Sequence, residues 1–61
     1  MAKIQLQEII TFLTESLQDA EKFDSGNDAA GRRLRAACQE AKTKLQQLRL
    51  DVQAERNNRK S

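Results

Sequence analysis

Residues 23–28 read Phe-Asp-Ser-Gly-Asn-Asp, and this stretch decides the fold because it interrupts an otherwise continuous helical pattern. Gly26 is free to take the left-handed conformation that ends many helices. Ser25 or Asn27 offers a side-chain oxygen to the unpaired amides of a following helix. The stretch therefore predicts a short turn between two helices.

The residues before this turn predict an amphipathic helix over about residues 3–23. Apolar positions recur at steps of four and three, the spacing of one helix face. They are Leu6, Ile10, Leu13, Leu17 and Ala20. Further residues widen the surface on one flank, namely Ile9, Phe12, Ser16 and Phe23. A single partner helix would not cover so wide an apolar surface.

The same pattern resumes after the turn and predicts a longer helix over about residues 28–58. Its apolar positions are Leu34, Cys38, Ala41, Leu45, Leu48 and Val52. Two apolar lines of equal period joined by a short connection predict an all-α, antiparallel two-helix hairpin. We interpret Cys38 as a small buried hydrophobe, and we expect residues 56–61 to fray because they lack apolar anchors.

The composition points to one small domain, residues 1–61, that needs an external source of stability. A single core of this size rarely supplies more than ~3–5 kcal/mol. With one cysteine and no histidine, the sequence excludes an intrachain disulfide and a Cys/His zinc site. Because the first helix has apolar surface left over, we expect two hairpins to form a homodimeric four-helix bundle.

The charge is divided unequally along the chain. The net charge is only +2, but residues 1–28 carry two lysines against six acids, whereas residues 29–61 carry nine Lys or Arg against three acids. Such asymmetry indicates nucleic acid or an acidic membrane surface as partner. The sequence has no apolar run of membrane-spanning length and no signal peptide, so we expect a cytoplasmic protein and no membrane role.

The second helix carries a line of cations and amides that we call the basic stripe. Its members recur at steps of three and four on one face: Arg32, Arg35, Gln39, Lys42, Gln46, Arg49, Gln53, Arg56 and Lys60. The acids of this helix lie on the other flank, where Glu40 and Glu55 precede Lys44 and Arg59 by four residues, as in helix salt bridges. Uncancelled cations suit a phosphate backbone, although such a face can also serve solubility alone.

The start of the second helix is a second candidate site. Gly26, Asn27 and Gly31 would expose backbone amides to a phosphate. Two features favour a structural reading instead. Asp28 already complements the helix dipole and would repel an anion, and small residues also occur where helices pack closely. Both readings remain open from the residues.

The segment 23–35, with Gly26-Asn27, Ala29-Ala30-Gly31 and Arg32-Arg33 within it, resembles the bacterial linker-histone-like family best known from chlamydiae. The resemblance spans roughly residues 20–60 and implies a nucleoid-associated DNA-binding protein. Chlamydial members continue into a long tail rich in Lys and Ala, whereas this sequence ends at Ser61. We therefore expect binding through the folded domain and Arg59 and Lys60.

Together these patterns predict a non-enzymatic, largely sequence-independent binder of double-stranded DNA that takes no cofactor, metal or small-molecule substrate. The candidate DNA-binding residues are Arg32, Arg33, Arg35, Lys42, Arg49, Arg56, Arg59 and Lys60. The absence of aromatics on the basic stripe disfavours single-stranded nucleic acid. Two alternatives stay open: a coiled-coil adaptor that binds other proteins, and a helical-hairpin dimer that binds structured RNA.

Overall fold

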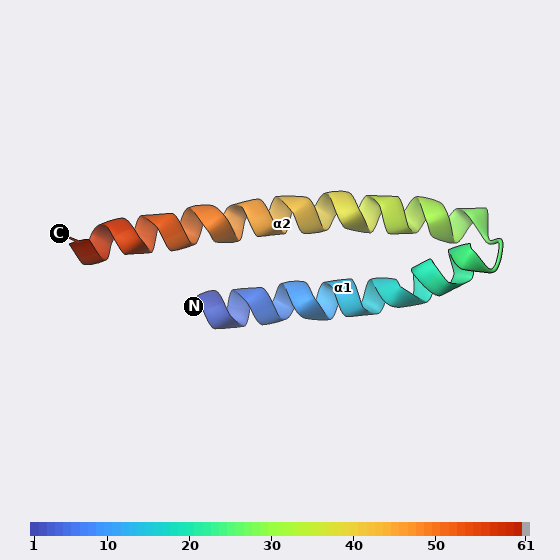
Figure 1. Ribbon diagram of the computed structural model, residues 1–61, viewed down its shortest axis with the longest axis horizontal. Coiled ribbons are helices and arrows are strands. Elements are labelled where there is room, and N and C mark those ends of the chain that lie inside the picture. The colour runs from blue at the N-terminus through green and yellow to red at the C-terminus, as the bar shows by residue number, and fades with distance from the viewer. Residues whose placement is uncertain (61) are drawn as a thin grey trace.

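The computed structural model describes residues 1–60 and consists of two α-helices joined by a tight turn. Helix α1 (Ala2–Asp24) and helix α2 (Asp28–Lys60) lie antiparallel and side by side (Figure 1). The structure confirms the predicted all-α hairpin. Among these residues no helix is long and apolar enough to cross a membrane.

The end of α2 differs from the prediction. Residues 56–60 do not fray but continue the helix to Lys60, and α2 extends past the N-terminus of α1 (Figure 1). Arg59 and Lys60 place positive charge at the helix C-terminus, where it complements the helix dipole. Arg59 also pairs with Glu55 at 2.9 Å. Ser61 lies outside the described residues.

The turn ends α1 with a pattern of backbone hydrogen bonds that requires Gly26. The amide of Asn27 donates to the Lys22 carbonyl at 3.0 Å, and the amide of Gly26 donates to the Phe23 carbonyl at 2.9 Å. This is the Schellman arrangement, in which the residue after the helix end takes a positive φ. Gly26 has a φ of +106°, as its place in the sequence predicts.

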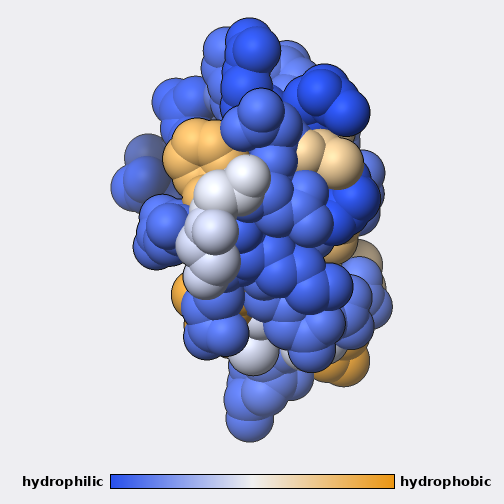
Figure 2. Space-filling model, turned by 90° about the vertical axis from the view of Figure 1, so that its right-hand side faces the viewer, coloured by the Kyte–Doolittle hydropathy of each residue, from blue (hydrophilic) through white to orange (hydrophobic). Residues whose placement is uncertain are grey.

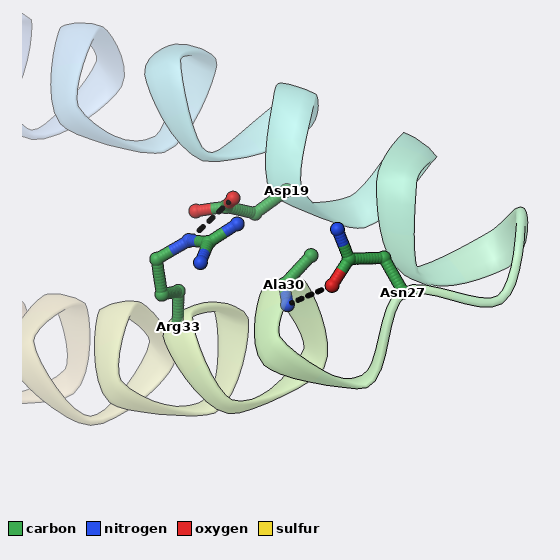
Figure 3. A network of polar contacts seen from close by, with 4 residues as sticks. All are labelled: Asp19, Asn27, Ala30 and Arg33. Carbon is green, nitrogen blue, oxygen red and sulfur yellow. Dashed lines mark hydrogen bonds and ion pairs between the residues drawn. The ribbon is translucent and has the colours of Figure 1, made fainter.

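Asn27 then begins α2 as its N-cap. Its side-chain Oδ1 accepts a hydrogen bond from the amide of Ala30 at 3.1 Å (Figure 3), which satisfies one of the free amides of the first turn. Ser25, the other predicted capping residue, instead donates from its hydroxyl to the Glu21 carbonyl at 3.1 Å. The sequence therefore placed the cap correctly at one of its two candidates.

The two helices touch along one line, which on α2 is occupied mainly by alanines. Ile9, Ala30 and Ala41 are the buried apolar residues of the described chain, with exposures of 4%, 0% and 5%. Alanines allow the two backbones to approach closely, so the hairpin is only one helix layer thick. Its Cα atoms extend over 54 × 16 × 10 Å.

Polar contacts bridge the helices along one side of this line, at every seventh residue of α1. We call this side the polar rim. Its contacts are a hydrogen bond from Gln5 Nε2 to Asp51 Oδ2 at 3.0 Å, the Lys44 ammonium 5.5 Å from the centre of the Phe12 ring, and an ion pair between Arg33 and Asp19 at 3.0 Å. A seven-residue interval is the repeat of two helices packed as in a coiled coil.

The structure corrects the prediction of which residues of α1 face α2. Leu6, Ile10, Leu13 and Leu17 of the predicted line stay exposed, and only its last member is partly covered. The inward positions are Ile9, Phe12, Ser16 and Ala20. The physical reason lies in the polar contacts that this choice allows, because the flank of the inward line then meets Arg33 and Asp51 of α2. The prediction that one helix would not cover the apolar surface of α1 is confirmed.

Cys38 was also predicted to be buried, and this is wrong, because Cys38 is exposed in the hairpin. In the sequence Cys38 comes directly after Ala37, which is partly covered. In the same way, Leu45 comes directly after the rim residue Lys44, and Val52 comes directly after the rim residue Asp51. Each step of one residue along a helix turns the side-chain direction by about 100° around the helix axis. The side chain of Cys38 therefore turns away from α1, together with those of Leu45 and Val52.

Most of the exposed large apolar residues gather on one face of the hairpin, while Ile4 and Leu50 lie elsewhere. Leu6 and Leu13 follow the rim residues Gln5 and Phe12 by one position in α1, as Leu45 follows Lys44 in α2. Because the helices are antiparallel, a step of one residue toward the C-terminus turns the side chain toward the same face of the hairpin in both helices. We call this surface the apolar face, and its members are Leu6, Ile10, Leu13, Leu17, Cys38, Leu45 and Val52.

The turn end of the molecule is different in character. Seen from the turn, the surface is mostly hydrophilic, and hydrophobic side chains show at its flanks (Figure 2). Just behind the turn the ring of Phe23 lies against Gly31. A Cβ atom at Gly31 would come within 2.5 Å of Phe23 Cδ1 and 2.7 Å of Cε1. Glycine is therefore needed at this position to keep the ring where it is.

We expect Gly31→Ala and Phe23→Ala to be strongly coupled in thermal or urea unfolding. Alone, Gly31→Ala displaces the Phe23 ring. In the Phe23→Ala background, the same change gains only the higher helix propensity of alanine, about 1 kcal/mol. The coupling free energy should be about 1–3 kcal/mol. Additive effects of the two substitutions would contradict the packing of the ring on Gly31.

Candidate nucleic-acid interface

The basic stripe occupies an exposed face of α2. All nine of its residues, from Arg32 to Lys60, are exposed. At 1.5 Å per residue it extends for about 42 Å along the helix axis. Because α2 is one continuous helix and the members recur at steps of three and four, the stripe follows one side of the helix along its length.

The cations of the basic stripe are not neutralised within the described chain. No carboxylate of residues 1–60 forms an ion pair with them; these cations are Arg32, Arg35, Lys42, Arg49, Arg56 and Lys60. Arg49 donates from Nη1 to Gln46 Oε1 at 2.8 Å, and this neutral amide holds the guanidinium without cancelling its charge. The stripe therefore presents a row of available positive charge.

The ion pairs of the described residues lie off the stripe. Lys44 pairs with Glu40 at 3.6 Å, and Arg59 pairs with Glu55 at 2.9 Å. The sequence predicted both as helix salt bridges, and both are confirmed. The third pair, between Arg33 and Asp19 (Figure 3), joins the two helices and belongs to the polar rim. The acids of α2 are thus kept apart from the stripe.

Two of the candidate DNA-binding residues consequently lie apart from the others. Arg33 is directed toward Asp19 of α1 (Figure 3), and Arg59 is directed toward Glu55 of its own helix. A guanidinium that already faces a carboxylate gains less from a phosphate than an unpaired one. The structure brings together the remaining cations of the stripe and separates these two from it.

The three candidate residues near the turn each have a structural role. Gly26 takes the positive φ that ends α1, Asn27 caps α2, and Gly31 accommodates the ring of Phe23. Asp28 supplies negative charge to the first turn of α2. These contacts account for the residue types at the turn without an anion.

The sequence reasoning missed that the basic stripe borders the apolar face. Lys42 and Arg49 follow Cys38 and Leu45 by four residues, so each cation lies one helical turn from an apolar residue of that face. A shallow hollow in the surface crosses the border and is lined by residues of both kinds, among them Cys38 and Lys42. The spacing of four was visible in the sequence, but its meaning depended on knowing which apolar line is exposed.

The arrangement suits a long anion. Within residues 1–60 no group of His, Cys, Asp or Glu side chains could hold a metal ion. Positive side chains in a straight, exposed row can contact successive phosphates, and glutamines between them donate hydrogen bonds without adding charge. The surface is therefore equipped for electrostatic binding to a nucleic-acid backbone.

Comparison with known proteins supports a family relationship over nearly the whole chain. Residues 3–58 match the family model described as "Histone H1-like protein Hc1". This match confirms the resemblance found around the turn and extends it through both helices. No curated protein and no solved structure matches the chain.

We expect Asn27→Ala to lower the free energy of unfolding by about 1 kcal/mol, because it removes the cap of α2. Asn27→Ser should restore most of this stability, since serine is also a good N-cap. If the role of Asn27 is structural, neither variant should change the salt dependence of DNA binding. A reduced salt dependence in both variants would instead place a phosphate at the turn. Urea unfolding and a DNA titration at several salt concentrations measure the two effects.

Proposed function

The chain belongs to the histone H1-like Hc1 family, and from that premise we propose that it is a nucleoid-associated protein that binds double-stranded DNA. In this proposal the chain is a single domain without enzymatic activity. It binds largely independently of sequence, through phosphate contacts of the basic stripe.

One observation carries the proposal: the stripe cations have no carboxylate partner in residues 1–60, whereas the cations off the stripe in α2 each have one. A face that served only solubility would not require this separation. Exposed cations gain affinity for DNA by releasing the counterions that surround it. Nothing in the stripe requires contact with base edges, so sequence tolerance follows from phosphate contacts.

Arg32, Arg35, Lys42, Arg49, Arg56 and Lys60 are the residues that we propose contact DNA most directly. Arg33 and Arg59 contribute to the general positive potential of α2, but each must share its charge with an acid. Gly26, Asn27 and Gly31 act indirectly, because they fix the turn and hence the exposed position of α2.

We also propose that the protein is a homodimer in which the apolar faces of two hairpins pack into a four-helix bundle. The support is the size of the exposed residues: the buried line holds Ile9 with two alanines, whereas Leu17 is 59% and Ile10 is 53% exposed. Burying a leucine side chain fully contributes about 1.5–3 kcal/mol. A hairpin that leaves these large apolar residues of α1 in water therefore has much to gain from a partner.

Replacing Arg35, Lys42 and Arg49 together by Gln should weaken DNA binding and lower the slope of log affinity against log salt. The slope should fall by up to about 2.7, because each phosphate that no longer meets a cation lowers it by about 0.9. The matched control replaces Arg33, Lys44 and Arg59 by Gln. It removes the same formal charge from paired cations, so we expect a smaller change.

Mobility-shift titrations of a 20-base-pair duplex at several salt concentrations measure both variants, and circular dichroism checks that helicity is kept. Equal weakening in the two triple variants would show that net charge, rather than the basic stripe, governs binding. Preference for an RNA hairpin over the duplex in competition would favour structured RNA as the ligand.

Leu45→Gln should convert the dimer to a monomer, whereas Leu50→Gln should not. Both leucines are on α2 with similar exposure, 42% and 54%, but only Leu45 belongs to the apolar face. Equilibrium sedimentation at micromolar concentration measures the difference. A wild-type protein that is a well-folded monomer under these conditions would rule out the proposed dimer.

A further inference from the structure

The border between the basic stripe and the apolar face determines what a partner on that face would meet. The cations nearest to it recur every seven residues and are called here the border cations: Arg35, Lys42, Arg49 and Arg56. The hollow that crosses the border is lined by apolar residues, Leu34 and Cys38 among them, and by the cations Arg35 and Lys42. Any molecule that covers the apolar face therefore lies beside these cations.

The dimensions of the apolar face fit a second copy of the chain. α1 is 23 residues long, or about 35 Å, and two helices are together about 20 Å wide. The footprint is thus about 700 Å², close to the roughly 800 Å² that each partner buries in a typical stable complex. The two helices and their turn account for residues 1–60, so no other described segment covers this face.

A second copy would bring few carboxylates to the border cations. Among the acids of α1, Asp19 lies on the polar rim, and Glu8 and Glu15 share that side of the helix. Glu21 and Asp24 lie nearest to the apolar face, and both are beside the turn. The border cations along the middle and the far end of α2 would therefore stay uncompensated in the dimer.

We propose that the DNA-binding surface is completed by a second copy: two hairpins pack by their apolar faces, and the border cations of both copies together receive the phosphates. This inference rests on the proposed function. From Arg35 to Arg56 the row extends for about 32 Å, close to the roughly 34 Å of one turn of duplex DNA. Two such rows on one particle carry twice the border cations of a monomer.

The arrangement makes dimer formation and DNA binding mutually dependent. Without DNA, the uncompensated border cations oppose association, and salt screens this repulsion. DNA neutralises the same cations, so it favours the dimer. By linkage, the dimer then binds DNA more tightly than the monomer does.

The first test measures the dimer without DNA. Sedimentation equilibrium at 50 mM and 500 mM NaCl should show a lower dimer dissociation constant at high salt. Replacing Lys42 and Arg49 by Gln should lower this constant about three- to tenfold at 50 mM NaCl and flatten its salt dependence. A control with Arg33 and Lys44 replaced by Gln removes the same charge from the polar rim and should change it less. A wild-type dimer that weakens with salt, or equal effects in both double variants, would overturn the proposal.

The second test measures binding to a 20-base-pair duplex by the chain with Leu45→Gln, and Leu50→Gln is the control. The Leu45 variant keeps every cation, yet it should bind at least about tenfold more weakly and with a smaller salt slope. The control should bind as the wild type does. Equal binding by all three would overturn the shared site and leave the proposed function standing. No binding by the wild type at any salt would instead overturn the proposed function.

Discussion

A two-helix hairpin has no interior, and this constraint shapes the rest of the molecule. Each helix touches one neighbour along one line, so only a few side chains are shielded from water, and here they are Ile9, Ala30 and Ala41. Such a line offers little hydrophobic stabilisation. The chain supplements it with a Schellman turn, a side-chain cap on α2 and three contacts across the polar rim.

The same constraint separates the surface into faces with different roles. On one side of the contact line, the polar rim joins the helices by a hydrogen bond, a cation–ring contact and an ion pair. On the other side, large apolar residues remain in water, and the basic stripe follows their edge along α2. On our proposals, association of two copies and binding of DNA use neighbouring surfaces, so the histone-like function would depend on a particle with two basic rows.

The family match and the geometry address different questions. The match over residues 3–58 says to which group of proteins the chain belongs, and DNA binding follows from it as a proposal. The geometry suggests which cations are available for that binding. Arg33 shows why this distinction matters, because the sequence grouped it with the other arginines and the structure places it beside Asp19 of α1.

Local chemistry allowed the sequence to determine the turn, the bounds of both helices within two residues and the salt bridges within α2, and it narrowed the cap of α2 to Ser25 or Asn27. Each of these depends on residues a few positions apart. The sequence also indicated the basic stripe and the excess apolar surface of α1. Only the tertiary structure decided which of two adjacent apolar lines faces α2, and with it the exposure of Cys38 and the place of Arg33. The reason is that both lines have the same period. The choice between them depends on contacts between residues 14 to 46 positions apart in the chain, which meet only when the hairpin closes.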